Sequence, residues 1–348
     1  MSPLRSHPAR RRRLSRFALP LGALLLALPL AGCGSDDSDD DAGSGDAGSF
    51  ETVSIDHVFG TTEIDERPER VVTWGWGSAD AALALGVTPV AMPTNSYGAT
   101  EEGYMPWQKE AIEASGDEEP TLLTDAEAPP FEEIAAANPD LILANYSGIT
   151  EADYEKLSKI ADTVAYPDQP WATPWRDVIT TVGDAIGKSE EADTLLEEID
   201  GEVAQAAADH PEFEGKTIAA VAIDPSAFYV YRAADPRVQF LEDLGFTLAP
   251  SVDELDTEED TFFYTISTEE VDKLTSDVLL SYVPNEERLA EIEGDKTFSA
   301  MEQFRAGTVA NVVGEDIVSS VSPPTALSLT WGLDTFVESL ATATQGAS

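Results

Sequence analysis

Short apolar runs alternate with longer amphipathic stretches from Phe50 onward, which is typical of α/β units built on mainly parallel sheets. In the first half, this pattern predicts strands over residues 71–74, 89–92, 141–144 and 163–166. It predicts helices there over residues 79–85, 131–137 and 151–160. In the second half, strands are expected over 218–223, 228–231, 278–282 and 309–312, and helices over 236–244, 268–274, 288–293 and 327–340.

Two segments, one in each half, share the same order of helix, loop and buried strand. They read "FEEIAAANPDLILA" over 131–144 and "STEEVDKLTSDVLLS" over 267–281. Between the halves, a polar stretch predicts one helix of roughly six turns and about 30 Å, with Ser189 as its cap and Pro211 at its end. We therefore expect two Rossmann-like α/β lobes, at 50–170 and 212–348, joined by a crossing segment and one long rigid helix over 171–211.

The N-terminal segment predicts export and a lipid anchor. An arginine-rich stretch precedes fourteen mostly apolar residues at 17–30, which are too few to span a bilayer but suit a signal peptide. "LAGC" follows and resembles the lipobox of bacterial lipoproteins, so residues 1–33 are interpreted as a signal peptide and Cys33 as the lipidation site. The alternative is an ordinary exported protein with a stray cysteine. Residues 34–49 are acidic and polar, and we expect a disordered tether.

The charge of the chain excludes some partners. It has 66 acidic and 20 basic residues, and six of the basic residues precede Cys33, so the mature chain carries a net charge of about −52. Such a surface repels nucleic acid and anionic lipid headgroups. The acidity is interpreted as a solvated coat, with an acid cluster for metal capture as the alternative. Cys33 is the only cysteine, so disulfides within the chain are excluded.

The sequence gives little support for an enzyme. "GWGSAD" at 75–80 misses the dinucleotide-binding pattern, because Asp80 replaces its third glycine and Trp76 crowds the phosphate approach. The histidines are His7, His57 and His210, too few and too scattered for a His/Cys metal cluster. A Ser–His–Asp arrangement with His57 or His210 stays open but nothing favours it. We therefore expect binding rather than catalysis.

Aromatic residues follow several of the predicted strands. Ligands of open α/β sheets bind in the crevice outside the carboxyl ends of the strands, so these side chains are expected to line one cleft between the lobes. For Trp175 and Trp331 we favour a packing role instead. The predicted ligand-binding residues are Trp74, Trp76, Tyr97, Trp107, Tyr146, Tyr231 and Arg232.

Several segments together resemble the ferric-siderophore substrate-binding lipoproteins of ABC importers, in the iron and cobalamin periplasmic-binding-protein family. The resemblance rests on 60–92, "FEEIAAANPDLILA", "YEKLSKIADTVAYP", "FYVYRAADPRVQFLEDLGF" and "ISTEEVDKLTSDVLL". It implies two lobes on a helical backbone, a ligand between them, and a monomer anchored by lipid on the outer face of the cell membrane. It also implies that a glutamate of each lobe docks on an arginine pocket of the permease. Glu132 and Glu269 hold the matching places, although Glu133 and Glu270 stand beside them.

The resemblance leaves the ligand class open among siderophores, haem and cobalamin. A haem carrier would offer the iron a His or Tyr, and a tyrosine ligand remains an alternative. Ferric tris-catecholates are strongly anionic and would need several basic residues near the cleft. A ferric hydroxamate is neutral or slightly cationic and suits aromatic walls with one arginine, Arg232. The siderophore would hold the iron, so no protein metal ligand and no cofactor are expected.

Overall fold

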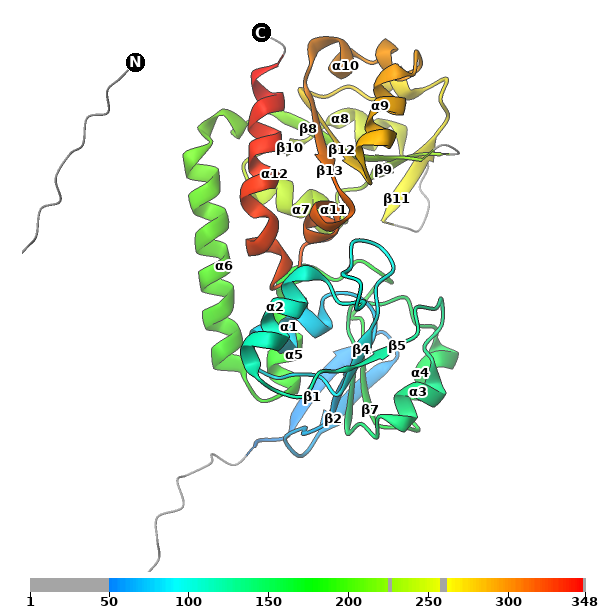
Figure 1. Ribbon diagram of the computed structural model, residues 1–348, viewed down its shortest axis with the longest axis vertical. Helices are drawn as coiled ribbons and strands as arrows, with labels where there is room; N and C mark the ends of the chain where they lie inside the picture. Colours follow the sequence, from blue (N-terminus) through cyan, green and yellow to red (C-terminus); the bar gives the residue numbers. More distant parts are fainter. Residues whose placement is uncertain (1–49, 225–226, 257–261, 347–348) are drawn as a thin grey trace, which may run out of the picture. The chain divides into compact units, whose positions relative to one another are not determined.

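The computed structural model describes residues 50–224, 227–256 and 262–346, so the predictions for the signal peptide, Cys33 and the tether lie outside the described residues. The described chain forms two α/β sheets with their helices and one long connecting helix (Figure 1), which confirms the predicted fold class. None of the described helices is long and apolar enough to cross a membrane. A hairpin that the sequence analysis missed precedes the first sheet, with strands β1 (Val53–His57) and β2 (Gly60–Ile64).

The first sheet is parallel, with the strand order β5-β4-β3-β6-β7. Its strands are β3 (Val71–Thr73), β4 (Ala91–Pro93), β5 (Thr121–Leu123), β6 (Leu141–Ala144) and β7 (Asp162–Ala165). The helices of this lobe are α1 (Ser78–Ala84), α2 (Pro106–Ser115), α3 (Phe131–Ala136), α4 (Glu151–Leu157) and α5 (Trp175–Ala185). Every residue of β3 and β6 is buried, as expected where helices cover both faces of a parallel sheet.

The second sheet is mixed, with the order β11-β9-β8-β12-β13 and β10 beside β8. Its strands are β8 (Thr217–Ile223), β9 (Phe228–Tyr231), β10 (Thr247–Leu248), β11 (Phe263–Ile266), β12 (Val278–Val283) and β13 (Val309–Val313). The helices are α7 (Pro236–Asp243), α8 (Pro250–Leu255), α9 (Glu286–Gly294), α10 (Glu302–Ala306), α11 (Glu315–Val321) and α12 (Ser328–Gln345). Strand β9 runs antiparallel to both β8 and β11, which the prediction of mainly parallel sheets did not anticipate at this edge.

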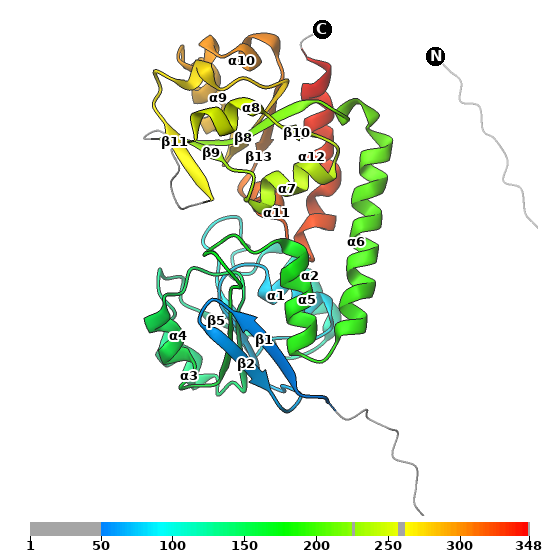
Figure 2. The same cartoon turned by 180° about the vertical axis from the view of Figure 1, so that it is seen from behind.

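The long connecting helix is α6 (Ser189–Asp209), and Pro211 begins the short 3-10 turn η1 (Pro211–Phe213) that follows it. The prediction of Ser189 as its cap was wrong. Lys188 is the cap residue, and the Ser189 hydroxyl instead donates a hydrogen bond to Asp184 at 2.5 Å. Figures 1 and 2 both show α6 running beside α12.

The predicted helix over 268–274 was also wrong. Only the 3-10 turn η2 (Val271–Lys273) forms between β11 and β12. Its backbone bonds join residues three apart, as from Lys273 N–H to the Glu270 carbonyl, and Leu274 already has an extended conformation. The segment is too short to form a stable helix by propensity alone, so the elements it packs on decide its structure. The two segments that looked alike in sequence therefore differ in local structure.

One hydrophobic cluster runs through both lobes. It includes buried side chains of β3 and β6 in the first sheet, of β8 and β12 in the second, and of α5, α6 and α12. Helix α6 contributes Ala192, Ile199 and Val203, which recur along one helical face. The connecting helix is thus packed along its length rather than standing free in solvent.

Candidate ligand-binding site

The glycines of "TWGWG" let the chain after β3 lie directly against the chain after β6. Gly75 has φ of +96°, and a Cβ on it would lie 2.3 Å from the Tyr146 carbonyl oxygen. The next residue, Trp76, donates its backbone N–H to that same oxygen at 2.9 Å. Gly75 therefore allows close backbone packing between two strand ends.

A cavity of about 400 Å³ opens beside this contact, at the carboxyl ends of the first sheet's strands. We call it the tryptophan pocket, and its lining residues are Trp74, Gly75, Trp76, Pro93, Thr94, Asn95, Asp125, Ala126, Glu127, Gly148, Ile149 and Trp171. Trp171 is 39% exposed and has φ of +58°, a conformation that is rare for a bulky residue and marks a functional candidate. A Cβ on Gly148 would lie 2.2 Å from the Trp171 indole nitrogen, so this glycine makes room for the ring.

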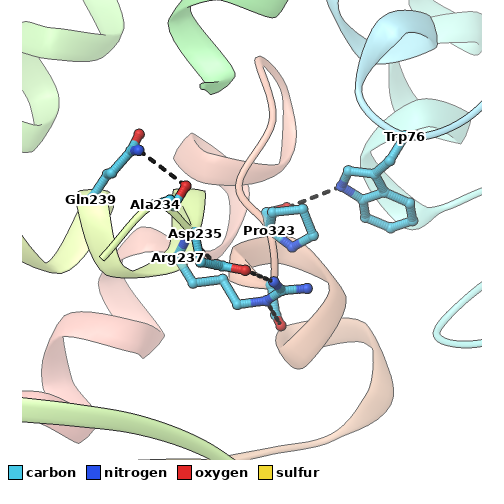
Figure 3. A network of polar contacts seen from close by, with 7 residues as sticks. Trp76, Ala234, Asp235, Arg237, Gln239 and Pro323 are labelled. Atoms are coloured by element: carbon cyan, nitrogen blue, oxygen red, sulfur yellow. Dashed lines mark hydrogen bonds and ion pairs between the residues drawn. The ribbon is translucent and has the colours of Figure 1, made fainter. Parts of the chain in front are cut away.

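A buried arginine of the second lobe forms a polar corner at the start of α7. Asp235 caps this helix by accepting the backbone N–H of Arg237 at 2.8 Å, and Pro236 occupies the first helical position. The Arg237 Nη1 donates to Asp235 Oδ2 at 2.6 Å, and Nε donates to the Ser322 hydroxyl at 2.7 Å (Figure 3). The guanidinium also lies 4.4 Å from the centroid of the Tyr231 ring. We call Arg237, Asp235, Ser322 and Tyr231 the Arg237 corner.

The Arg237 corner holds a charged but compensated guanidinium. Only 11% of the Arg237 side chain is exposed, and the Asp235 side chain is fully buried. Burial alone lowers the pKa of Arg237, but the adjacent Asp235 carboxylate outweighs that effect, so the net shift is upward. The arginine therefore remains cationic, and it offers its remaining N–H donors without a net excess of positive charge.

The tryptophan pocket and the Arg237 corner meet at the segment between α11 and α12. The Trp76 indole N–H donates to the Pro323 carbonyl at 3.0 Å, and the preceding Ser322 accepts from Arg237 (Figure 3). Tyr146 lies between the two regions, because its ring contacts the Trp171 ring with centroids 6.0 Å apart and it lines a small cavity together with Pro236 of the second lobe. Hydrogen bonds to the neighbouring residues Ser322 and Pro323 thus link the Arg237 corner to a wall of the tryptophan pocket.

A buried carboxylate also joins the lobes. Asp80 on α1 accepts hydrogen bonds from the Trp107 indole and the Gln108 amide, both at 2.6 Å, and from the Thr325 hydroxyl of the other lobe. Burial raises the pKa of Asp80, and the three donated hydrogen bonds oppose that shift. Asp80, which replaces the third glycine of the dinucleotide-binding pattern, therefore has a structural role between the lobes.

The structure brings together most of the predicted ligand-binding residues. Trp74 and Trp76 line the tryptophan pocket, Tyr231 lies under Arg237, and Tyr146 lies between them. Tyr97 lies next to the second lobe, where the Ser319 hydroxyl donates to its backbone carbonyl at 3.4 Å, and burial, Glu315 and Tyr231 raise its pKa to about 12. These placements leave their ligand contacts as predictions.

Two of the predicted residues are engaged elsewhere. Trp107 is only 3% exposed, binds Asp80, and packs against Trp331 with ring centroids 5.4 Å apart. Arg232 is paired with Asp256 at 2.7 Å, whereas Arg237 lies over the Tyr231 ring, and the ligand contact of Arg232 stays a prediction. Trp175 is buried in the core, as expected.

Two further candidates, Arg237 and Trp171, were missed by the sequence analysis. The signal for Arg237 was "DPR", because an Asp cap followed by proline starts a helix and fixes the next residue in its first turn. The signal for Trp171 was its place in a proline-rich crossing between the lobes, where ordinary packing is sparse.

The two predicted docking glutamates, Glu132 and Glu269, are exposed, and they differ from the adjacent Glu133 and Glu270 in their hydrogen bonds. Glu133 accepts two hydrogen bonds from Thr124, and Glu270 pairs with Lys273 at 2.8 Å. Across the described part of the chain, neither Glu132 nor Glu269 has a hydrogen bond or an ion pair. Of each neighbouring pair, Glu132 and Glu269 are thus the less engaged carboxylates, and their docking role stays a prediction.

Neither histidine of the described chain is placed for metal binding or catalysis. His57 is hydrogen-bonded to Thr62 at 3.0 Å, and His210 pairs with Glu212 at 3.0 Å and stacks on Phe213. No group of three or more His, Cys, Asp or Glu side chains within the described residues could hold a metal ion.

Comparisons with known proteins identify the family. Residues 71–312 match the family model described as periplasmic binding protein, and the chain belongs to this family. A probable siderophore-binding lipoprotein of Bacillus subtilis strain 168, YfiY, is 26% identical over 273 residues, which cover 78% of this chain and 80% of the relative.

Solved structures are also similar to this chain. The crystal structure of PiaA from Streptococcus pneumoniae TIGR4 in complex with ferrichrome has a TM-score of 0.78 and 35% identity, covering 85% of this chain and 99% of that one. The structure of Staphylococcus aureus SirA complexed with staphyloferrin B has a TM-score of 0.66 and 25% identity, with 85% and 99% coverage.

Proposed function

We propose that this protein captures a ferric siderophore of the hydroxamate type and delivers it to an ABC permease for iron uptake. The observation that carries the proposal is the Arg237 corner, a single buried guanidinium beside an aromatic pocket. The ferrichrome complex of the similar PiaA structure supports this class of ligand, and the probable siderophore-binding lipoprotein from Bacillus supports a siderophore in general.

The charge of the site favours a hydroxamate over a catecholate. The oxygens of a ferric hydroxamate carry partial negative charge, and the free N–H donors of Arg237 suit them. A tris-catecholate complex brings a net charge of −3, but Asp235 already compensates the one arginine of this corner. The free energy needed to desolvate such an anion here would exceed the free energy gained from its contacts with Arg237. The tryptophan pocket supplies the apolar surface that such ligands bury.

The remaining parts of the proposal concern delivery. We assign the lipid anchor to Cys33, which would hold the protein on the outer face of the cell membrane by the tether at 34–49. Glu132 and Glu269 would dock on two basic pockets of the permease. The protein would release its ligand unchanged, as a substrate-binding protein does, and would act as a monomer without a cofactor.

Tryptophan-fluorescence titration tests the ligand class, because Trp74, Trp76 and Trp171 line the pocket. The panel consists of ferrichrome, ferric enterobactin, ferric citrate, haem and cobalamin, with iron-free ferrichrome as the control. We expect saturable quenching at equimolar ferrichrome and weak or no response to ferric enterobactin. Tighter binding of ferric enterobactin, haem or cobalamin than of any ferric hydroxamate would contradict the proposal. Mass spectrometry of the recovered ligand would reveal any turnover.

A further inference from the structure

The tryptophan pocket has an uncompensated negative charge. Two of its twelve lining residues are acidic, Asp125 and Glu127, and none is basic. Asp125 accepts a hydrogen bond from the neutral hydroxyl of Ser96 at 2.7 Å. Neither carboxylate has an ion pair within the described ranges of the chain. The pocket therefore differs from the Arg237 corner, where the cation has its own carboxylate at 2.6 Å.

The aromatic walls of the tryptophan pocket favour a cationic ligand group, in addition to its negative charge. Three indoles line it, and the face of an indole attracts an ammonium group more strongly than the face of any other side chain. An aromatic cage next to carboxylates is the combination that proteins use for ammonium ligands. An anionic group would have to face the same carboxylates without a basic side chain in the lining to offset them.

We propose that the tryptophan pocket selects ferric hydroxamates that carry a cationic ammonium arm, and this rests on the proposed function. The iron–hydroxamate centre lies at the Arg237 corner, and the arm enters the tryptophan pocket between the indoles, toward Asp125 and Glu127. The charge on the arm, rather than the chemistry at the iron, distinguishes the preferred ligand from other hydroxamates.

The test compares two ligands with the same iron centre. Ferrioxamine B ends in an ammonium group, and its N-acetyl derivative is neutral, while ferrichrome serves as a neutral cyclic reference. At an ionic strength on the order of 0.01 M, we expect ferrioxamine B to bind about three- to tenfold more tightly than its N-acetyl derivative. The preference should shrink at about 0.15 M salt, because Asp125 and Glu127 are exposed to solvent.

The variant Asp125→Asn/Glu127→Gln should abolish this preference, so that ferrioxamine B and its N-acetyl derivative bind to it with equal affinity. The matched control is Asp193→Asn/Glu197→Gln, which makes the same charge change on the exposed face of α6 and should keep the preference. Equal affinity of the wild-type protein for the two ligands would overturn the inference, as would a preference that survives in the pocket variant. If none of the three ferric hydroxamates binds, the proposed function fails as well.

Discussion

The tryptophan pocket and the Arg237 corner use opposite means to present a binding surface. The charge of the Arg237 corner is balanced within the protein, since Arg237 is held by Asp235 and Ser322 and lies over Tyr231. In the tryptophan pocket, Trp171 is 39% exposed and the carboxylates have no cation. The side chains of the Arg237 corner are therefore preorganised before a ligand binds, whereas the tryptophan pocket offers an exposed ring and carboxylates that only a ligand would pair.

The largest effect is expected for Arg237→Ala, which removes the cation of the corner. It leaves the fully buried Asp235 carboxylate unpaired, so we expect a loss of about 3–5 kcal/mol in the free energy of unfolding as well as lost binding. Thermal unfolding and fluorescence titration measure the two effects.

The double variant Asp235→Asn/Arg237→Gln separates these two effects. Asparagine keeps the helix cap and no charge is left buried, so much of the stability should return while ligand binding does not. Arg232→Ala is the control, because Arg232 is bound to Asp256, and its affinity should stay within a few fold of the wild type. Normal ferrichrome affinity in the double variant would remove the corner from the ligand site.

The next effect is expected for Trp171→Ala, which tests the pocket side of the comparison. Losing an aromatic contact with the ligand should cost on the order of 1–3 kcal/mol, or about ten- to a hundredfold in affinity. The exposed ring contributes little to the packed core, so the thermal midpoint of the ligand-free protein should barely change. An unchanged affinity would show that this ring lies outside the ligand contacts.

Trp107→Phe should give the reverse result, and it tests whether a tryptophan near the pocket is structural. The change removes the indole hydrogen bond to the buried Asp80, so the free energy of unfolding should fall by about 1–3 kcal/mol. Ferrichrome affinity should stay the same because Trp107 does not line the tryptophan pocket. A selective loss of affinity with unchanged stability would restore the original prediction for this residue.

The smallest effect in solution is expected for Glu132→Ala/Glu269→Ala, since both side chains are exposed and outside the pocket. Stability and ferrichrome affinity should be unchanged, but radioactive iron uptake by cells should fail, because the two carboxylates act together in docking. Glu133→Ala/Glu270→Ala is the matched control, because these neighbours are engaged by Thr124 and Lys273. Full uptake by the first variant would remove the docking assignment.

The sequence predicted those parts of the fold that depend on local pattern. The buried runs gave β6 and β9 with their correct bounds, and the polar stretch between the lobes gave α6. The hairpin of β1 and β2 and the turn η2 were missed or misread, because short polar segments take their structure from the neighbours they pack on.

The candidate site was predictable in its location but not in its polar contacts. Aromatic residues after strands pointed to the edge of the first sheet at which the tryptophan pocket opens, and Trp76 and Tyr146 lie there. The sequence could not rank Arg232 and Arg237 as ligand-binding candidates, because it does not show that Arg232 forms an ion pair with Asp256 or that Arg237 donates to Ser322. Both partners are distant in sequence, so no local pattern reveals them.

The single hydrophobic cluster that passes from one sheet through α5, α6 and α12 to the other has a thermodynamic consequence. Separate domains melt separately when few contacts cross between them, but here neither lobe can lose its packing without exposing apolar surface of the other. We therefore expect one calorimetric transition for the whole folded unit, with equal calorimetric and van't Hoff enthalpies. A ligand bound at either face of the cleft would then raise the melting temperature of both lobes together.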